Sequence, residues 1–439
     1  MRTNSCQINR LLTGLAIGCL FGWLLASCQP SSVSVGGSTS LAVPFPSETP
    51  QPSRTIPSSP LPTRTLTTPP PTPTLTLQAA GPTAFPPGVN PLTGLQVSDP
   101  AMLELPPALI SISNSPQTAR PQTGLSYSSM VFEMYIGVGA SRFLAIFYGD
   151  YPPETFGSTA EAVRIGPIRS GRLPYEKLRL LYKGFLVFAS ASDRVLQFLD
   201  EYHLVFGDTK AEDVNTARIS VSELKQLAGE FKERLGMPRL FGLRFDPLPP
   251  PGGKEGLFLW IPFHYTDQVI WRYDPARGAY LRHQDQTDGV TFRPSYDALN
   301  DQPLYFENVA VIFADYHYYD ATYFNIDLLY ITRAPALLFR DGKMYEIFWT
   351  TGNEEYERTT GRFRPIRFVD RQGNPIPLHP GRTWIEIVPL HTAYGETVDS
   401  EVYKDLITRQ EPGSGNWAVY FYPPLLEGSP TPSPIPESE

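Results

Sequence analysis

The segment over residues 29–88 limits what this chain can fold into, because it consists mainly of Pro, Ser and Thr with scattered small apolar residues and only three charges. Such a composition cannot bury enough apolar surface to offset the entropy lost on ordering. Proline runs such as the one at 68–73 favour extended polyproline II, at about 3.1 Å per residue. We therefore expect a disordered tether over residues 28–88 and a folded part that follows it.

The first 27 residues have the layout of an export signal. Arg2 and Arg10 are the only charges, and residues 11–26 are almost wholly apolar. This stretch is short for a membrane span, which needs about 20 residues. It ends in Leu-Ala-Ser-Cys, which resembles the bacterial lipobox. We expect cleavage before Cys28 and attachment of lipid, palmitate included, to that cysteine; the alternative is an uncleaved membrane anchor with an incidental cysteine.

The lipid expected on Cys28 removes thiol chemistry from the mature chain. Cys6 and Cys19 would leave with the signal peptide 1–27, so disulfides, zinc thiolates and cysteine nucleophiles are excluded. The anchor also places the folded part on the extracytoplasmic face of the cell membrane or outer membrane. Nucleotide cofactors are scarce there, and we expect no cofactor.

The acidic composition argues against nucleic-acid binding. The chain has 36 Lys and Arg against 44 Asp and Glu, a formal net charge of −8 at pH 7. Loss of the two signal-peptide arginines makes this about −10. Acidic proteins are repelled by nucleic acids and by anionic lipid surfaces. The expected partners are therefore the membrane, through the lipid on Cys28, and a cell-wall component or envelope protein.

Residues 89–245 alternate between strand-like and helix-like patterns, which is typical of an α/β layer. The helix predictions rest on apolar residues that recur at helical spacing, and the strand predictions on short apolar runs. Strands are predicted at Ala108–Ser113, 130–136, 142–148 and 184–189, and helices at 174–183, 192–202 and 220–235.

A loop rich in proline and glycine at 246–256 marks the expected domain boundary. The folded part has about 335 residues, more than one core usually holds, so two domains are expected. The sequence predicts an α+β protein in which an α/β domain at 89–245 precedes a mostly β domain at 257–424, followed by a disordered tail at 425–439. The strands predicted in the second domain are 257–263, 269–273, 279–283, 309–316, 323–332, 344–349, Thr383–Pro389 and 417–422.

Several strings between residues 90 and 390 resemble the YerB-like lipoproteins, a family defined by an N-terminal and a C-terminal domain of unknown function. The most distinctive string is Gly-Pro-Ile-Arg-Ser-Gly-Arg at 166–172. The resemblance implies a lipoprotein with two domains and carries no established reaction. Other matching strings are Asn-Pro-Leu-Thr-Gly-Leu at 90–95, Arg-Pro-Gln-Thr-Gly-Leu at 120–125, Arg-Phe-Leu-Ala-Ile-Phe at 142–147 and Leu-His-Pro-Gly-Arg-Thr-Trp-Ile at 378–385.

The chain departs from this family at two positions. Members tend to place a histidine in the strand near Phe188 and a His-Asn pair near residues 214–215. Here Phe188 and Val214 stand at those histidine positions, while Asn215 remains. If the histidines act chemically in the family, this chain lacks them, and an enzymatic activity shared with the family becomes a weaker expectation.

A group of arginines around the Gly-Pro turn is the leading candidate site. Arg164, Arg169 and Arg172 lie within nine residues of one another, with Ser170 between them, and Arg142 could join them. Guanidinium groups bind carboxylates and phosphates, and free N–H groups of a turn help to hold an anion. The turn is therefore a candidate pocket for a peptide carboxylate, a phosphate or a group on a wall polymer.

The alternative is that these arginines form ion pairs with Glu133, Glu161 or Glu176 and only fix the turn. Glu133 also belongs to the candidate site, because a carboxylate beside Arg169 and Arg172 could perform acid–base chemistry.

A weaker candidate is the polar stretch that contains Asp315 and His317. On a continued strand these two side chains share one face, and with nearby Asp327 they could bind a metal or a sugar. A metal site needs three or four converging ligands, and only two are sure to share a face. We therefore expect no metal, and a polar loop with half-buried tyrosines is the simpler account.

The sequence thus predicts a non-enzymatic envelope lipoprotein that binds or scaffolds a cell-envelope ligand or partner. The first alternative is a cell-envelope hydrolase or wall-modifying enzyme that uses Glu133 with Arg169 and Arg172. The second is an assembly factor, which would present an exposed apolar patch instead.

Overall fold

The computed structural model describes residues 77–157, 161–208, 215–352, 354–397 and 411–424. The expected signal peptide, Cys28, the tether up to residue 76 and the tail lie outside these residues. Within the described ranges, no helix is long and apolar enough to cross a membrane.

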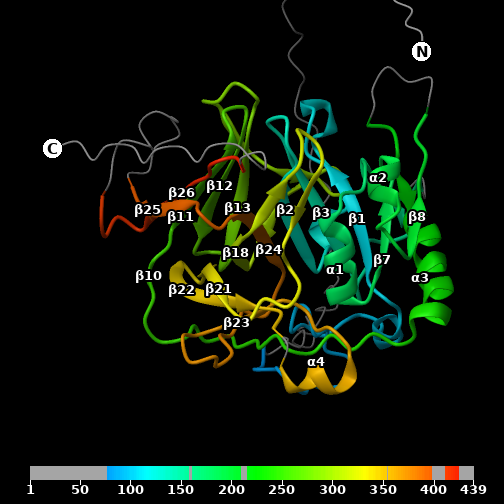
Figure 1. The fold of residues 1–439 in the computed structure, drawn as a ribbon, viewed down its shortest axis with the longest axis horizontal. Coiled ribbons are helices and arrows are strands. Elements are labelled where there is room, and N and C mark those ends of the chain that lie inside the picture. Colours follow the sequence, from blue (N-terminus) through cyan, green and yellow to red (C-terminus); the bar gives the residue numbers. More distant parts are fainter. Residues whose placement is uncertain (1–76, 158–160, 209–214, 353, 398–410, 425–439) are drawn as a thin grey trace, which may run out of the picture. The chain divides into compact units, whose positions relative to one another are not determined.

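An eleven-stranded sheet, here called the main sheet, organises the fold (Figure 1). Strand β24 pairs in parallel with both β2 and β18, so it joins the strands from the second half of the chain to those from the first half in one continuous sheet. In order, the strands are β10 (Lys254–Glu255), β22 (Lys343–Thr350), β21 (Ala334–Arg340), β18 (Asn308–Ala314), β24 (Thr383–Pro389), β2 (Met130–Tyr135), β3 (Ser141–Phe147), β1 (Ala108–Ser113), β7 (Phe185–Phe188) and β8 (Tyr202–Leu204), with β23 (Arg367–Val369) paired to β22.

A seven-stranded second sheet packs against one face of the main sheet. It contains β14 (Phe292–Pro294), β13 (Ala279–Asp285), β12 (Asp267–Asp274), β11 (Phe258–His264), β26 (Asn416–Tyr420) and β25 (Ala393–Glu396), with β17 (Tyr305–Phe306) paired to β13. Four strand pairs lie apart from both sheets: β4 (Thr155–Phe156) with β5 (Glu161–Ala162), β6 (Arg164–Ile165) with β9 (Ile219–Ser220), β15 (Tyr296–Asp297) with β16 (Gln302–Pro303), and β19 (Tyr316–Tyr318) with β20 (Phe324–Ile326).

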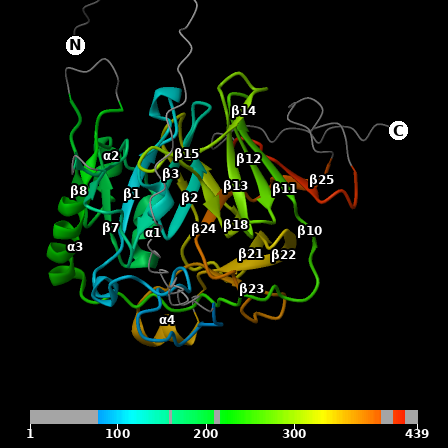
Figure 2. The same cartoon turned by 180° about the vertical axis from the view of Figure 1, so that it is seen from behind.

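Helices α1 (Pro174–Tyr182) and α3 (Val221–Leu235) pack on the main sheet beside β1, β7 and β8 (Figures 1 and 2). Tyr182 of α1 meets Phe132 edge-on, with ring centroids 5.7 Å apart. Phe231 of α3 stacks on Phe185 at 4.3 Å. The remaining helical segments are short: α2 (Asp193–Leu196), α4 (Glu355–Thr360) and the 3-10 turns η1 (Pro100–Glu104), η2 (Gln117–Ala119) and η3 (Leu125–Tyr127).

The core between the two sheets is aromatic. Trp384 of the main sheet meets Phe143 at 4.9 Å and Trp271 of the second sheet at 5.4 Å, measured between ring centroids. All three side chains are buried. Aromatic pairs in such edge-on arrangements contribute about 0.5–1.5 kcal/mol each beyond the area that they bury.

The described part of the chain is mostly β with few helices, and a two-domain layout fits the sequence prediction. Two predicted elements are shorter than expected. The helix predicted at 192–202 ends at Leu196, because Tyr202–Leu204 pair with β7 as β8. The strand predicted at 323–332 is limited to Phe324–Ile326, and Tyr330 has a left-handed φ of 61° that no regular strand accommodates.

Residues 77–88, which the sequence assigns to the tether, contact the folded part. Ala80 and Phe245 exchange two backbone hydrogen bonds, with N···O distances of 3.0 and 2.8 Å. Ala80 is buried, and Phe85 packs edge-on against Phe245. The small apolar residues at the end of the proline-rich segment therefore have a partner, although their composition alone does not predict one.

Asp297 ties the second half of the chain to the first and should be important for stability. Its buried carboxylate accepts hydrogen bonds from the backbone N–H groups of Gly124 and Ser126, both at 2.8 Å, and from the Ser126 hydroxyl at 2.6 Å. Because D297N replaces one acceptor oxygen by a donor, we expect a loss of about 2–4 kcal/mol in the free energy of unfolding, measured by urea denaturation. The matched variant D301N changes an exposed acid of the same loop and should lie within about 0.5 kcal/mol of wild type. Equal stability of the two variants would refute this role.

Candidate anion-binding site

The Gly-Pro-Ile-Arg-Ser-Gly-Arg segment fills a gap between two parallel strands. Strands β1 and β7 pair only at 108–110 with 185–187. Beyond that point Arg169 N donates to Ser111 O at 2.9 Å, and Ala189 N donates to Arg169 O at 3.0 Å. The segment therefore lies at the carboxyl ends of β1 and β7, the location where open α/β sheets bind ligands.

Arg142 lies beneath this turn, on the face of the main sheet that α1 covers. It is opposite Ser113 on β1 and Met134 on β2, and only 4% of it is exposed. Its Nε and Nη1 atoms are buried and have no hydrogen-bond partner among the described residues. Burial lowers the pKa of Arg142 to about 9; the Tyr175 hydroxyl opposes this effect, and the charges of Arg172 and Arg169 add to it.

Arg172 and Arg169 are half-buried beside Arg142. Burial lowers the pKa of Arg172, Tyr175 opposes that effect and Arg169 reinforces it. Arg172 Nη1 donates to the backbone oxygen of Gly171 at 2.9 Å. We call Arg142, Arg169 and Arg172 the arginine cluster. Since the neighbouring arginine charges lower the pKa of Arg142 and of Arg172, an anion bound at the cluster would relieve this repulsion.

Ser170 is at the rim of the arginine cluster. Its hydroxyl is 3.1 Å from the hydroxyl of the exposed Ser190, and its backbone oxygen accepts a hydrogen bond from Ser111. Arg164 lies elsewhere: it is exposed on β6, and its Nη2 donates to Arg218 O at 3.3 Å. The structure therefore brings Arg142, Arg169, Ser170 and Arg172 together and leaves Arg164 outside.

The acids considered as partners for these arginines are engaged elsewhere or exposed. Glu176 accepts from Arg179 Nε at 2.9 Å, within α1. Glu161 is exposed on β5. Glu133 accepts from Arg282, as described next, so none of the three neutralises Arg142.

Glu133 faces the second sheet, on the opposite side of the main sheet from Arg142. It is opposite Phe143 on β3, and adjacent strand residues such as Arg142 and Phe143 point to opposite faces. Arg282 Nη2 donates to Glu133 Oε2 at 2.8 Å and to Oε1 at 3.1 Å, and Ser141 Oγ donates to Oε1 at 2.7 Å. The predicted pocket of Glu133 with Arg169 and Arg172 is therefore not formed, because the strand register separates them.

Glu386 lies next to Glu133 on the parallel strand β24 and is also fully buried. Trp271 Nε1 donates to its Oε1 at 2.9 Å, while Oε2 is buried without a partner among the described residues. Burial raises the pKa of Glu386 well above its ordinary value, and the charge of Glu133 raises it further. Burial also raises the pKa of Glu133, but Arg282 opposes that effect. We infer that the pair holds one proton and that Glu386 carries it.

The weaker candidate residues lie at the β19–β20 hairpin. His317 Nε2 is 2.8 Å from Asp327 Oδ2, and Lys177 of α1 is 3.0 Å from Asp327 Oδ1. Asp315 is exposed and precedes the strand. In the described part of the chain no three His, Cys, Asp or Glu side chains converge as metal ligands. The hairpin lies near the arginine cluster. The Tyr318 hydroxyl is close enough to Arg172 to oppose the lowering of the pKa of that arginine.

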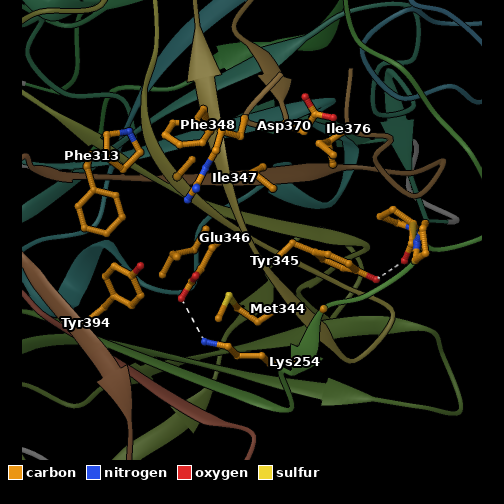
Figure 3. A pocket seen from close by; sticks show the side chains of 17 residues that line it. Lys254, Phe313, Met344, Tyr345, Glu346, Ile347, Phe348, Asp370, Ile376 and Tyr394 are labelled. Atoms are coloured by element: carbon orange, nitrogen blue, oxygen red, sulfur yellow. Dashed lines mark hydrogen bonds and ion pairs between the residues drawn. The ribbon is translucent and has the colours of Figure 1, made fainter. Parts of the chain in front are cut away.

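A groove of about 590 Å³ runs over β21 and β22 (Figure 3). Lys254 Nζ donates to Glu346 Oε1 at 3.2 Å, and Tyr345 donates its hydroxyl to the backbone oxygen of Pro250. Phe313 and Tyr394 form an apolar end. No residue singled out in the sequence lines this groove, and its one lysine is already paired.

Sequence reasoning did not identify Tyr175, Arg282 and Glu386. Tyr175 is a neighbour of the arginine cluster, Arg282 is the partner of Glu133, and Glu386 is the buried acid whose pKa is raised. Arg282 belongs to a family-like string at 280–282, but none of the three belongs to a motif with a known chemical role. Each gains its role only from the strand register and from packing between the sheets.

Comparison with known proteins gives two family matches. Residues 92–223 match the N-terminal domain, and residues 259–385 the C-terminal domain, of a "Protein of unknown function (DUF3048)". "Putative lipoprotein YerB" of Bacillus subtilis (strain 168) is 26% identical over 315 residues, which cover 68% of this chain and 86% of that protein. A crystal structure of YerB from Bacillus subtilis is similar in fold, with a TM-score of 0.54 and 24% identity over 68% of this chain and 96% of that chain.

The proton inferred on Glu386 predicts a pH dependence of stability. Because the folded-state pKa of Glu386 lies above the unfolded value, the folded chain holds more protons, and stability falls as pH rises from about 4.5 towards the raised pKa. We expect the free energy of unfolding of the wild type to fall as the pH rises above about 4.5, and E386Q to lose most of that slope. Chemical denaturation at several pH values tests this, with E233Q, at an exposed position of α3, as the control that keeps the wild-type slope. An E386Q curve parallel to wild type would place the proton elsewhere.

Proposed function

The chain belongs to the YerB-like family of proteins with DUF3048 N- and C-terminal domains, and on that premise we propose that it is a lipid-anchored envelope protein that binds an anionic ligand at the arginine cluster. The ligand would be a carboxylate or phosphate group of a cell-wall component or of an envelope protein. The anchor would be the lipid on Cys28, with the proline-rich segment as spacer. The lipobox-like string and the name of the relative support the proposed lipid anchor.

The buried guanidinium of Arg142 carries the binding proposal. Arginine stays charged in proteins, so the cost of its burial is not relieved by loss of a proton, whereas a buried carboxylate becomes neutral by taking up a proton. An uncompensated buried charge costs several kcal/mol. Natural chains retain such a cost where function requires it. An anion that pairs with Arg142 would offset it and stabilise the folded state.

The alternative prediction, an envelope hydrolase that uses Glu133 with Arg169 and Arg172, needs these groups in one pocket. Glu133 lies on one face of the main sheet, where Arg282 holds it. Arg169 and Arg172 lie beside Arg142, which is on the other face. We therefore do not propose it.

Substitution of Arg142 separates a binding role from a structural one. R142M removes a buried unpaired charge and keeps most of the volume, so we expect the ligand-free protein to gain about 1–4 kcal/mol in stability. The same variant should lose the rise in melting temperature that inorganic phosphate or N-acetyl-dialanine gives the wild type. R172Q should also lose that response, whereas R164Q, at the exposed arginine outside the cluster, should keep it. A destabilised R142M that still responds to both anions would contradict the proposal.

Substitution of Cys28 tests the anchor. With C28A we expect loss of palmitate labelling in cells, together with failure of cleavage before residue 28. S27A keeps a small residue before the cysteine and should remain labelled. Membrane association with no labelling of the wild type would favour an uncleaved apolar anchor instead.

A further inference from the structure

A polar cavity of about 490 Å³ opens where the two family domains meet. Its walls come from residues 114–122 of the N-terminal domain and 282–301 of the C-terminal domain. No member of the arginine cluster lines it. The volume is within the range of small-molecule sites, which is about 300–1,000 Å³.

The floor of this junction cavity is made of buried polar side chains. Asn114, Gln122, Arg282 and Gln284 line it, and each is at most 4% exposed. Because buried amides and guanidinium groups that are already hydrogen-bonded cannot reorient freely, the floor presents fixed polar atoms to a ligand. The bonds that hold it run from Asn114 Nδ2 to Ser141 Oγ (2.9 Å), from Gln122 Nε2 to Ser113 O (3.0 Å), from Gln284 Nε2 to Asp267 Oδ1 (3.0 Å) and from Arg282 Nη2 to Glu133 Oε2 (2.8 Å).

Among the described residues the rim supplies one unpaired cation, Arg293, and one unpaired carboxylate, Asp301. The charges of Arg120 and Arg282 are balanced from behind the floor, by Asp267 at 3.8 Å and by Glu133 at 2.8 Å. Arg293 is exposed at the rim and forms no ion pair with any described residue. One carboxylate on a ligand would match this charge, since guanidinium groups bind carboxylates in two-point contacts.

The remaining lining favours hydroxyl groups over apolar side chains. Five of the thirteen lining residues are amides, three are arginines, and none carries an aliphatic side chain other than two prolines. Amides both donate and accept hydrogen bonds, as pairs of sugar hydroxyls do. Tyr296 is 39% exposed and lines the rim, which supplies an aromatic ring for stacking on a pyranose. An apolar side chain of a peptide would find no aliphatic contacts in this lining other than the two prolines.

We propose that the junction cavity binds a sugar that carries a carboxylate, with the hydroxyls on the amide floor, the ring on Tyr296 and the carboxylate on Arg293. This site goes beyond the proposed function, because it uses no residue of the arginine cluster. Two kinds of acidic sugar have this chemistry: amino sugars with a lactyl ether and uronic acids.

Calorimetric titration of the detergent-solubilised full chain tests the proposal. The probes are N-acetylmuramic acid and glucuronic acid, with N-acetylglucosamine and glucose as their neutral counterparts. We expect at least one acid to bind about tenfold more tightly than its neutral counterpart. The acid with the larger preference identifies the kind of sugar. Equal affinity for acids and neutral sugars, or no binding of either acid, would overturn the proposal.

Three variants locate the contacts. R293Q should abolish the tenfold preference for the acid and leave neutral-sugar binding unchanged, and Y296A should weaken both. R358Q, at an exposed arginine of α4, is the matched control and should bind as wild type. R172Q, which weakens the arginine cluster, should keep the preference for the acid. A preference lost in R172Q but kept in R293Q would assign the carboxylate to the arginine cluster and refute this site.

Discussion

The ion pair between Glu133 and Arg282 sets the relation between the two sheets. Glu133 comes from β2 of the main sheet and Arg282 from β13 of the second sheet, and both are almost fully buried. Arg282 also lies over the rings of Phe143 and Trp384, with its Cζ 5.0 and 4.9 Å from their centroids. A buried ion pair repays its desolvation only when its remaining polar atoms find partners. Ser141 and Ser295 supply two of these, whereas Arg282 Nε is buried without a hydrogen-bond partner among the described residues. The junction cavity has its floor on the same network.

Glu386 and Arg142 are buried on opposite faces of the main sheet, and each has side-chain atoms without a hydrogen-bond partner among the described residues. The consequences differ. On the face towards the second sheet the group is Glu386, which can take up a proton and become neutral. On the face under α1 it is Arg142, whose pKa remains at about 9 even after burial. A guanidinium group with that pKa is charged at neutral pH, so its relief must come from an anion. The asymmetry between the two groups explains why one is a stability determinant and the other a candidate binding group.

Much of the fold follows from local sequence pattern, and the site only in part. The run Ala108–Ser113 is a strand with the predicted bounds, and the apolar spacing of Val221–Leu235 predicts α3. The arginine turn was also identifiable, because its residues are close in sequence. The role of Glu133 was not, because the side of the sheet it faces relative to Arg142 depends on the residues of the turn at 136–140 and on the register that follows it. Strand β21 was missed because Pro335 weakens its strand pattern.

Strand β24 gives the two family domains a shared structure. It lies between β2 of one domain and β18 of the other and is parallel to both, so its backbone groups are satisfied only when both domains are in place. It also carries Trp384 and Glu386 into the space between the sheets. A hinge between the domains would have to break this ladder and expose the buried Glu133–Arg282 pair. The arginine cluster and the junction cavity are therefore held on one rigid frame, and their ligands would meet preformed polar groups rather than a closing cleft.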